Sequence, residues 1–421
     1  MSVVILLALG GLTVANYRTC PDVRYPPFIM STLWLLAMTI YYVAPMEING
    51  IGILTALIFI ATILAFSGGG QLALAFHNSN SDIQATGSTP VAWAAAHSRL
   101  KKIFLTLSAA TLPLVIEKAF QMVSQSGSEI FFIGLRTELL AADSGGYGLL
   151  GYIAVLSFFT TFLYAIEPRS GIGEKLQSYL SLAISLVYAV LSTGRSTIVF
   201  ILVVLMGIAF MRRKSNFTRV VLTAFVFFLF FGFFAIATLK GGDPDATWAE
   251  NISSIGESLL VYEIGPLPAF DQVARADLPL EYGKNTLIGP LNSLRGLAGM
   301  TRVSRLREEV HVPFPTNVYT GINAAYRDFG VPGVVLVFFL VGGASTYFYL
   351  RGLAGDPLYI FCYAVSLYPL LLVTFSDEYF DPMNAWIMYG VAAYLYFRRV
   401  RAVNTTEWSG ISPFARSLAN R

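Results

Sequence analysis

Long apolar runs recur along this chain, and they constrain its fold more than any other feature. Most of them approach the roughly 20 residues that a helix needs to cross a bilayer. Charged residues make up only 13% of the chain, whereas a soluble domain usually carries about 25%. Because a backbone in lipid must satisfy its own hydrogen bonds, a chain of this kind folds into helices. The sequence therefore predicts an all-α polytopic integral membrane protein.

About eleven transmembrane helices are predicted, with boundaries good to roughly 2–4 residues. The apolar runs lie near residues 2–16, 28–44, 50–66, 103–122, 147–166, 175–193, 196–211, 219–239, 332–350, 358–375 and 384–397. This division predicts four parts: N-terminal transmembrane helices over 1–239, a loop domain over 240–331, C-terminal transmembrane helices over 332–397 and a tail over 398–421.

Lysine and arginine in the short loops predict the orientation, because cytoplasmic loops carry an excess of both. They fall in alternate loops and in the tail, at Arg18 and Arg24, then Arg99, Lys101 and Lys102, then Arg169 and Lys175, then Arg212, Arg213, Lys214 and Arg219, then Arg351, and finally Arg398, Arg399 and Arg401. The N-terminus is therefore expected outside the cell membrane and the C-terminus inside. Residues 240–331 form the one long outer loop, and a loop of that length usually serves a function.

Charge is segregated along this outer loop. Eight acids and one base lie between Gly241 and Glu281, whereas no acid and five bases follow up to residue 307, namely Lys284, Arg295, Arg302, Arg305 and Arg307. In a helix, Arg295, Arg302 and Arg305 would project within roughly 80° of each other. Arginine forks bind phosphate bidentately, so the cluster indicates an anion site. Ion pairs with the upstream acids, or contact with water and headgroups, would explain each arginine singly.

Arg195 is a second candidate for binding an anion. It lies in Ser192-Thr193-Gly194-Arg195-Ser196, a turn between two apolar runs on the predicted outer face. The turn itself needs only glycine and serine, so the arginine has no obvious packing role. Either it points into a cavity at the lipid boundary, or it reaches toward headgroups as a snorkelling side chain.

The end of the outer loop is rich in conformational signals. Two prolines, Pro313 and Pro315, enforce extended backbone, and Asn317 is placed to cap a helix running through Gly321 to Arg327. Gly330 and Gly333 would end that helix and begin the next span. The stretch is either architecture alone or a rigid junction whose polar groups line a site.

Several short motifs lie in order over about the second half of the chain. They are Tyr262-x-x-Gly265-Pro266, Tyr282-Gly283 shortly before Thr286-Leu287, Thr316-Asn317-Val318-Tyr319-Thr320, and Asp328-Phe329-Gly330-x-x-Gly333. With these motifs and one long outer loop late in the chain, the sequence resembles the O-antigen polymerases (Wzy). The resemblance implies a GT-C-like glycosyltransferase of the bacterial inner membrane.

The resemblance also implies a substrate and a reaction. The enzyme would polymerise repeat units linked to polyprenyl (undecaprenyl) diphosphate, moving the growing glycan from its carrier to the non-reducing end of an incoming lipid-linked repeat. No cofactor or metal is implied, since arginines would stabilise the departing diphosphate. Expected partners are the lipid-linked oligosaccharide and membrane lipid, with a flippase and a chain-length regulator as candidates. Nucleic acid is not expected, because the net charge is only +3.

Roles for individual residues follow from both arguments. Arg195 matches the placement of an essential membrane arginine in the related ligases, which suggests that it binds the diphosphate, with Arg295 closing over the same group. The general base is expected among Glu263, His311 and Asp328. The remaining candidates for substrate binding are Arg295, Arg302, Arg305, Asn317, Tyr319, Arg327 and Tyr282.

Departures from the related families leave alternatives open. O-antigen ligases have His-Asn where this chain has Thr316-Asn317, and the Arg-x10-Gly spacing of some polymerases is absent from both outer loops, of which the earlier, 123–146, offers only Arg136. The nearest alternatives are a ligase and a polymerase of capsule or exopolysaccharide. An alternative of another class is a flippase or transporter, although neither mid-membrane charges nor an inverted repeat stands out.

Overall fold

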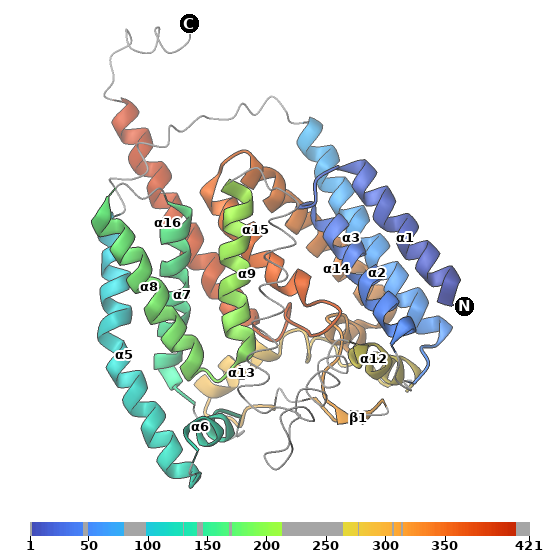
Figure 1. Ribbon diagram of the computed structural model, residues 1–421, viewed down its shortest axis with the longest axis horizontal. Coiled ribbons are helices and arrows are strands. Elements are labelled where there is room, and N and C mark those ends of the chain that lie inside the picture. The colour runs from blue at the N-terminus through green and yellow to red at the C-terminus, as the bar shows by residue number, and fades with distance from the viewer. Residues whose placement is uncertain are drawn as a thin grey trace, which may run out of the picture. The chain divides into compact units, whose positions relative to one another are not determined.

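The computed structural model describes residues 2–44, 49–79, 98–128, 130–140, 146–167, 171–212, 264–276, 278–304, 307–312 and 315–409. Within these ranges the secondary structure is almost all helical (Figure 1), and a single sheet pairs two short strands, β1 (Val310–His311) and β2 (Pro315–Thr316). Six of the described helices are long and apolar enough to cross a membrane. The predicted class, an all-α polytopic membrane protein, is confirmed.

Every predicted span that falls within the described residues coincides with a helix. The six long apolar helices are α1 (Ser2–Thr19), α2 (Pro26–Val43), α3 (Ile53–Ser79), α5 (Ser98–Ser126), α7 (Gly151–Ile166, preceded by the 3-10 turn η1, Gly148–Leu150) and α14 (Asn323–Leu353). The other predicted spans correspond to α8 (Ile172–Leu191), α9 (Arg195–Arg212), α15 (Pro357–Leu371) and α16 (Met383–Ser409). The span predicted near 219–239 lies outside the described residues.

The segments between the spans also contain helices. α6 (Phe131–Leu140) lies in the earlier of the two loops predicted outside, while α12 (Pro266–Arg275) and α13 (Ile288–Leu297) lie in the long one. α12 begins with proline, whose fixed φ suits the first turn and whose missing N–H would have no partner there. The long loop predicted outside therefore contains helices and a two-stranded sheet among its described residues between 264 and 322.

α14 changes direction near its start. Gly330 has φ +66°, a backbone conformation that favours glycine, and Pro332 follows it. The prediction that a short helix ends at this point and a span begins is confirmed. The predicted cap at Asn317 is wrong, because the helix begins at Asn323 with Ile322 as its N-cap residue, and that cap makes no side-chain hydrogen bond.

The chain forms two compact units. The first contains the described residues of Met1–Asp82, Leu202–Gly355 and Cys362–Asn384, and the second those of Ile83–Ile201, Asp356–Phe361 and Ala385–Arg421. Each unit is built on its own helix contacts.

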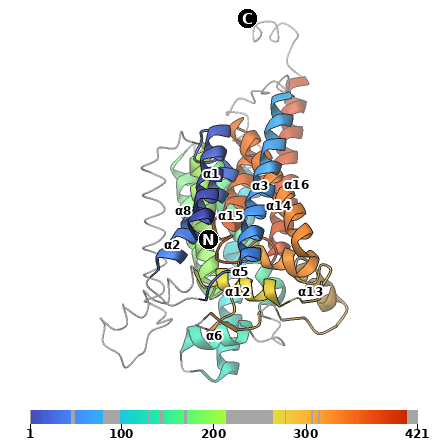
Figure 2. The same cartoon turned by 90° about the vertical axis from the view of Figure 1, so that its right-hand side faces the viewer.

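In the first unit, α3 packs closely along α14 (Figures 1 and 2). Two glycines make this approach feasible, because a Cβ at Gly69 would lie 1.9 Å from the carbonyl oxygen of Phe339. A Cβ at Gly342 would lie 2.1 Å from the carbonyl oxygen of Phe66. Without an aqueous driving force, membrane helices associate through such close backbone packing at small residues.

Hydrogen bonds join loops of the first unit to one another, and the joined loops fall into two groups. Arg24 donates to the carbonyl of Phe210 at 3.1 Å and Tyr349 donates to Asp22 at 2.8 Å, which links segments predicted to lie inside. The backbone N–H of Gly52 donates to Asp271 at 2.8 Å, which links two segments predicted outside. The grouping of loops agrees with the predicted topology, while the side on which each group lies stays a prediction.

The second unit is held by polar contacts between its helices. The hydroxyl oxygens of Ser157 and Ser185 lie 2.9 Å apart, and those of Thr161 and Ser181 lie 2.8 Å apart. These hydrogen-bonded hydroxyl pairs join α7 to α8. At one end of these helices, Lys101 forms a buried ion pair with Glu167, which also accepts a hydrogen bond from Tyr396. Hydrogen bonds of this kind between helices are typical of membrane proteins.

Candidate functional site

The described residues from 264 to 322, called the outer segment because they are predicted to lie outside, dock on the beginning of α14 through their backbone. The N–H of Glu281 donates to the carbonyl of Arg327 at 3.0 Å, and the N–H of Tyr282 donates to the carbonyl of Asp328 at 3.1 Å. Tyr282 has φ +47°, uncommon for a bulky residue, and the residue is 78% exposed. This strained turn carries the segment that leads into α13.

Asp328 is the anchor of this docked segment. Its carboxylate is completely buried and accepts hydrogen bonds from the N–H of Asn285 (3.0 and 3.1 Å), the N–H of Thr286 (2.7 Å) and the Thr286 hydroxyl (2.8 Å). The Asn285 amide donates to it as well, at 2.9 Å. This many hydrogen bonds satisfies a buried carboxylate, and it leaves few lone pairs on the oxygens that could accept a proton from a substrate. The arrangement therefore favours a positioning role for Asp328 over the predicted role as general base.

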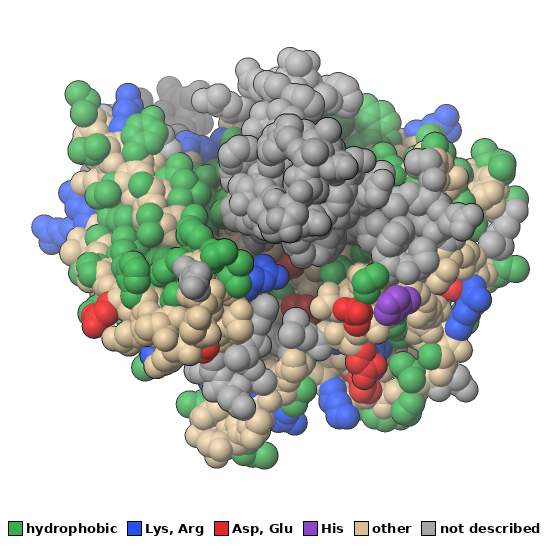
Figure 3. Space-filling view, turned by 60° about the horizontal axis from the view of Figure 1, so that its bottom comes forward, with side chains coloured by type: hydrophobic (Ala, Val, Ile, Leu, Met, Phe, Trp, Pro, Cys, Tyr) green, Lys and Arg blue, Asp and Glu red, His purple; other side chains and the backbone are tan. Residues whose placement is uncertain are grey.

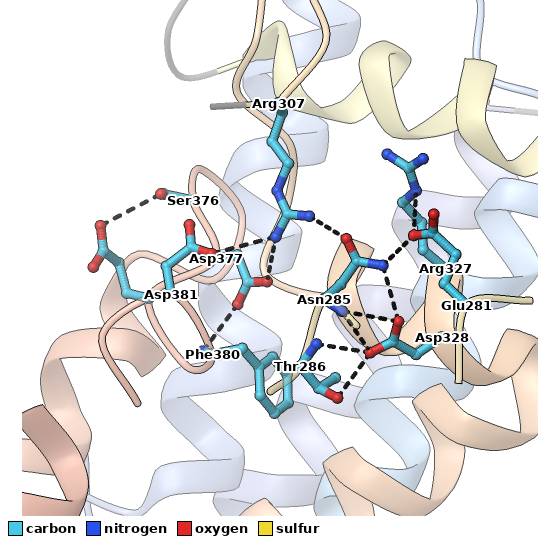
Figure 4. A network of polar contacts seen from close by, with 11 residues as sticks. Glu281, Asn285, Thr286, Arg307, Arg327, Asp328, Ser376, Asp377, Phe380 and Asp381 are labelled. Carbon is cyan, nitrogen blue, oxygen red and sulfur yellow. Dashed lines mark hydrogen bonds and ion pairs between the residues drawn. The ribbon is translucent and has the colours of Figure 1, made fainter. Parts of the chain in front are cut away.

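Asn285 connects Asp328 to a wider polar network (Figure 4). Its amide also donates to Glu281, which forms an ion pair with Arg327 at 3.6 Å. Its carbonyl oxygen accepts from Arg307 at 2.5 Å. Residues more than 40 positions apart thus share one chain of charge-assisted contacts, which fixes the orientation of each side chain.

Arg307 carries the network onto the loop between α15 and α16. One of its nitrogens lies 3.3 Å from a carboxylate oxygen of Asp381 and 3.8 Å from one of Asp377. Arg307 is largely buried, and Asp381 is the nearer of these two acids. The predicted pairing of the basic cluster with upstream acids therefore does not hold for Arg307, because its ionic partners come from a different loop.

Two acids of that loop have shifted pKa values. Burial, reinforced by the charge of Asp381, raises the pKa of Glu378 to about 7. Burial also raises the pKa of Asp377 well above its usual range, although Arg307 opposes the shift. A carboxyl group with a pKa near neutrality can take up and release a proton at physiological pH. Glu378 is therefore a candidate base that the sequence analysis missed.

The loop that contains Glu378 was visible in the sequence. The stretch from Ser376 to Asp381 is the acidic short loop between two spans. Its lack of lysine and arginine indicated topology, and nothing in it singled out Glu378 as a base. Nothing in the sequence indicated that Arg307, about 70 residues earlier, would reach this loop.

The basic cluster differs from its predicted form. α13 ends at Leu297 and Gly299 has φ +70°, so Arg295 and Arg302 do not share one helix, and the predicted helical cluster is wrong. The chain instead turns back, and a guanidinium nitrogen of Arg302 lies 3.0 Å from where a Cβ at Gly296 would be. Both arginines therefore lie at the end of α13. Arg305 lies outside the described residues.

The remaining candidates are spread over the outer segment. Tyr319 is buried and donates to the carbonyl of Glu308 at 2.9 Å, a packing contact, whereas Asn317 is exposed. His311 is exposed on β1, where its backbone carbonyl accepts from Gln272 at 2.7 Å. Glu263 lies outside the described residues. Figure 3 shows acidic and basic side chains gathered among hydrophobic ones on the face that the outer segment helps to form.

The second unit contains a cavity of about 410 Å³ beside the turn that precedes Arg195. Ser192, Thr193 and Gly194 line it, together with Arg136 of α6 and apolar side chains of α5, α7 and α8. Thr193 has φ +51°, and its N–H is held by the carbonyl of Val190 at 3.0 Å. α9 begins at Arg195, whose side chain is outside the described part of the chain.

The walls of the cavity are mainly apolar, with a few polar groups among them. This composition suits an amphipathic ligand more than a fully solvated one. Arg136 was the one cation of the earlier outer loop in the sequence analysis, and the structure places it in the lining of this cavity.

Comparison with known proteins gives one informative match. An O-antigen polymerase from Shigella dysenteriae is 26% identical to this chain over 271 residues, which is 63% of the chain and 66% of that relative. The match thus spans just under two thirds of the relative's own length. No protein-family model matches the chain, and no solved structure matches it. The resemblance found in the motifs is confirmed, since the chain is similar to an O-antigen polymerase over most of its length.

Proposed function

We propose that this protein polymerises oligosaccharide repeat units carried on polyprenyl diphosphate, at the outer face of the bacterial inner membrane. The observation that carries the proposal is the similarity to an O-antigen polymerase over 271 residues. A multi-pass helical fold supports it, because a lipid-linked substrate is presented at the membrane surface. The N-terminus would lie in the periplasm, the C-terminus in the cytoplasm, and residues 240–331 would form the periplasmic loop domain.

The reaction is a glycosyl transfer between two lipid-linked molecules. A hydroxyl oxygen at the non-reducing end of the incoming repeat attacks the anomeric carbon of the growing glycan. The bond from that carbon to the diphosphate oxygen breaks, and the diphosphate leaves with the electron pair. A base takes the proton of the hydroxyl. The protein must therefore supply a cationic group near the diphosphate and a proton acceptor near the hydroxyl.

Arg195 is our proposed ligand for the diphosphate. It follows directly on a turn that lines a cavity with apolar walls, which fits a headgroup attached to an isoprenoid chain. Preorganised cations stabilise the charge of a leaving group where water is excluded, and no divalent metal is then required. Arg295 and Arg302 at the end of α13, with Lys284, are candidates for further contacts to the anionic substrate.

For the base, we add Glu378 to His311 and Glu263. Its pKa of about 7 and its place in the loop contacted by Arg307 support this choice. The network of Arg307, Asn285 and Asp328 would hold the outer segment against α14, so that residues such as Tyr282 and Arg327 face the substrate in a fixed geometry. A flippase and a chain-length regulator remain candidate partners.

Purified protein with a synthetic polyprenyl-diphosphate repeat unit tests the proposal. We expect a ladder of products that differ by one repeat, formed equally well with and without a chelator. A single transfer to lipid A core without a ladder would indicate a ligase, and no covalent product at all would contradict the proposal. Activity that is abolished by chelator and restored by magnesium or manganese would overturn the metal-independent mechanism.

A further inference from the structure

α13 exposes its leucines although it buries polar groups: its buried residues are Ile288, Gly289 and Asn292. Its inward side carries Asn292, whose amide donates to the carbonyl of Val303 at 2.8 Å and whose carbonyl oxygen accepts from the Val303 N–H at 2.9 Å. The hydroxyl of Ser293, also in α13, accepts a hydrogen bond of 2.8 Å from the side-chain amide of Asn384. Its outward side carries leucine. A helix on the surface of a protein in water shows the opposite pattern, with apolar residues inward.

The outward leucines form a continuous apolar face. Leu291 is 37% exposed, Leu294 62% and Leu297 86%, and Met300 just beyond the helix is 61% exposed. Positions 291 and 294 are three residues apart and positions 294 and 297 are again three apart, so these side chains lie along one side of the helix. Contiguous exposed apolar residues of this kind indicate a surface that contacts a protein or a membrane.

Cations border this face. Between residues 282 and 304 the chain contains Lys284, Arg295 and Arg302 and no acid. Lys284 and Arg302 are exposed, and Arg302 is packed back against Gly296 at the end of the helix. Leucines on one face with lysine and arginine beside them are typical of helices that lie in the headgroup region of a bilayer with anionic lipids.

The anchoring of α13 places it at the end of membrane helices. Asn384, the second residue of α16, donates to the carbonyl of Gly289 at 3.0 Å as well as to Ser293. The segment before α13 is bound to residues 327 and 328 of α14, and Figure 2 shows α13 near this end of α14. A helix held at the point where spanning helices begin lies at the level of the membrane surface.

We propose that α13 is an interfacial helix, whose leucine face enters the adjoining leaflet and whose flanking cations bind anionic phospholipid headgroups. The partner is the bilayer surface itself. This inference does not depend on the proposed polymerase activity, because it rests on the exposure, charge and anchoring of α13. It explains why five large apolar residues from 287 to 300 have more than a third of their surface exposed, while Asn292 of the same helix is buried.

Fluorescence in vesicles tests the proposal without any activity assay. Cys20 and Cys362 are replaced by serine, and Leu294→Cys and Leu297→Cys are each labelled with an environment-sensitive dye. Glu309→Cys, an exposed position on the same outer segment, is the matched control. The protein is reconstituted in vesicles of brominated phosphatidylcholine with or without phosphatidylglycerol, and each variant must elute as the parent protein does in size exclusion.

We expect the dyes at residues 294 and 297 to be quenched several-fold by brominated acyl chains and protected from aqueous iodide, whereas the dye at residue 309 shows the reverse. Quenching should increase with phosphatidylglycerol, and Lys284→Gln with Arg302→Gln should remove that increase. Iodide quenching at residues 294 and 297 equal to that at residue 309 would overturn the proposal. So would protection from both quenchers, since it would mean that protein covers the leucines.

Discussion

The hydroxyl of Thr286 donates a hydrogen bond of 2.8 Å to the carboxylate of Asp328, and the N–H of the same threonine donates another at 2.7 Å. Forty-two residues separate the two in sequence, so this contact determines where the outer segment meets α14. It also bears on the proposed role of Asp328, because a carboxylate that accepts several hydrogen bonds at once positions the backbone that donates them.

We expect Thr286→Val to destabilise the protein by about 1.5–3 kcal/mol, because it removes one hydrogen bond to a charged acceptor. Asp328→Ala should cost more, since it leaves several buried donors unsatisfied. Thermal unfolding of the purified protein in detergent, together with the product ladder, measures both. Polymerisation should fall with stability in both variants. Should Asp328→Asn unfold like the wild type but make no polymer while Thr286→Val is fully active, Asp328 is the base after all.

Glu378 should make stability depend on pH near neutrality. Its pKa is about 7 in the folded protein and ordinarily 4.5, so the folded state holds a proton that the unfolded chain releases. The stability contributed by the protonated carboxyl is complete below about pH 4.5 and is lost as the pH rises through about 7. Glu378→Gln should flatten this part of the profile, and Glu309→Gln, an exposed control, should not. An unchanged profile in Glu378→Gln would contradict the assignment.

Arg195→Ala should lose most of the polymerase activity, because it removes a charge-assisted contact to the diphosphate worth on the order of 2–4 kcal/mol, or roughly 10²–10³-fold in rate. Arg195→Lys should retain part of it, since lysine offers a point charge in place of a planar fork. Protein level in the membrane is the control. A normally accumulating Arg195→Ala that builds full-length polymer at the wild-type rate would show that the diphosphate role is wrong.

Gly69→Ala should destabilise the first unit, because the added methyl group would meet the Phe339 carbonyl at 1.9 Å and force α3 away from α14. Overpacking of this kind typically costs about 1–3 kcal/mol. Gly390→Ala is the matched control, since no atom lies within 4 Å of the Cβ position there. The measurement is the melting temperature of each variant in the same detergent, and equal temperatures would contradict the packing argument.

Labelling of single cysteines with an impermeant reagent in intact cells tests the orientation. After Cys20 and Cys362 are replaced, a cysteine at Glu309, an exposed position, should be labelled from outside, whereas one at Arg213 should react only after lysis. The expectation follows from the excess of lysine and arginine in the loops predicted inside. Labelling of the Arg213 position in intact cells would reverse the assigned topology.

Much of the fold was predictable because membrane insertion is decided by local sequence. Apolar length predicted the helical class and the spanning helices observed within the described residues, and the glycines predicted the break at Gly330, since each depends on a few neighbouring residues. Local reasoning failed where a distant contact fixed the backbone. Asn317 has the chemistry of a cap, but the helix begins six residues later at Asn323, because the chain near Asn317 pairs with β1 and contacts Glu308 through Tyr319.

The candidate site depended on contacts between distant segments, and these no sequence pattern specified. The motifs identified Asp328 and the cationic stretch, but only the tertiary structure placed Asn285 and Thr286 on that carboxylate and directed Arg307 to Asp381. Likewise, the turn before Arg195 was visible in sequence, whereas the cavity beside it and the place of Arg136 in its lining were not. The physical reason is that helix formation and insertion are governed by interactions within about 20 residues, while burial and ion pairing are governed by whichever segments the packing of helices brings together.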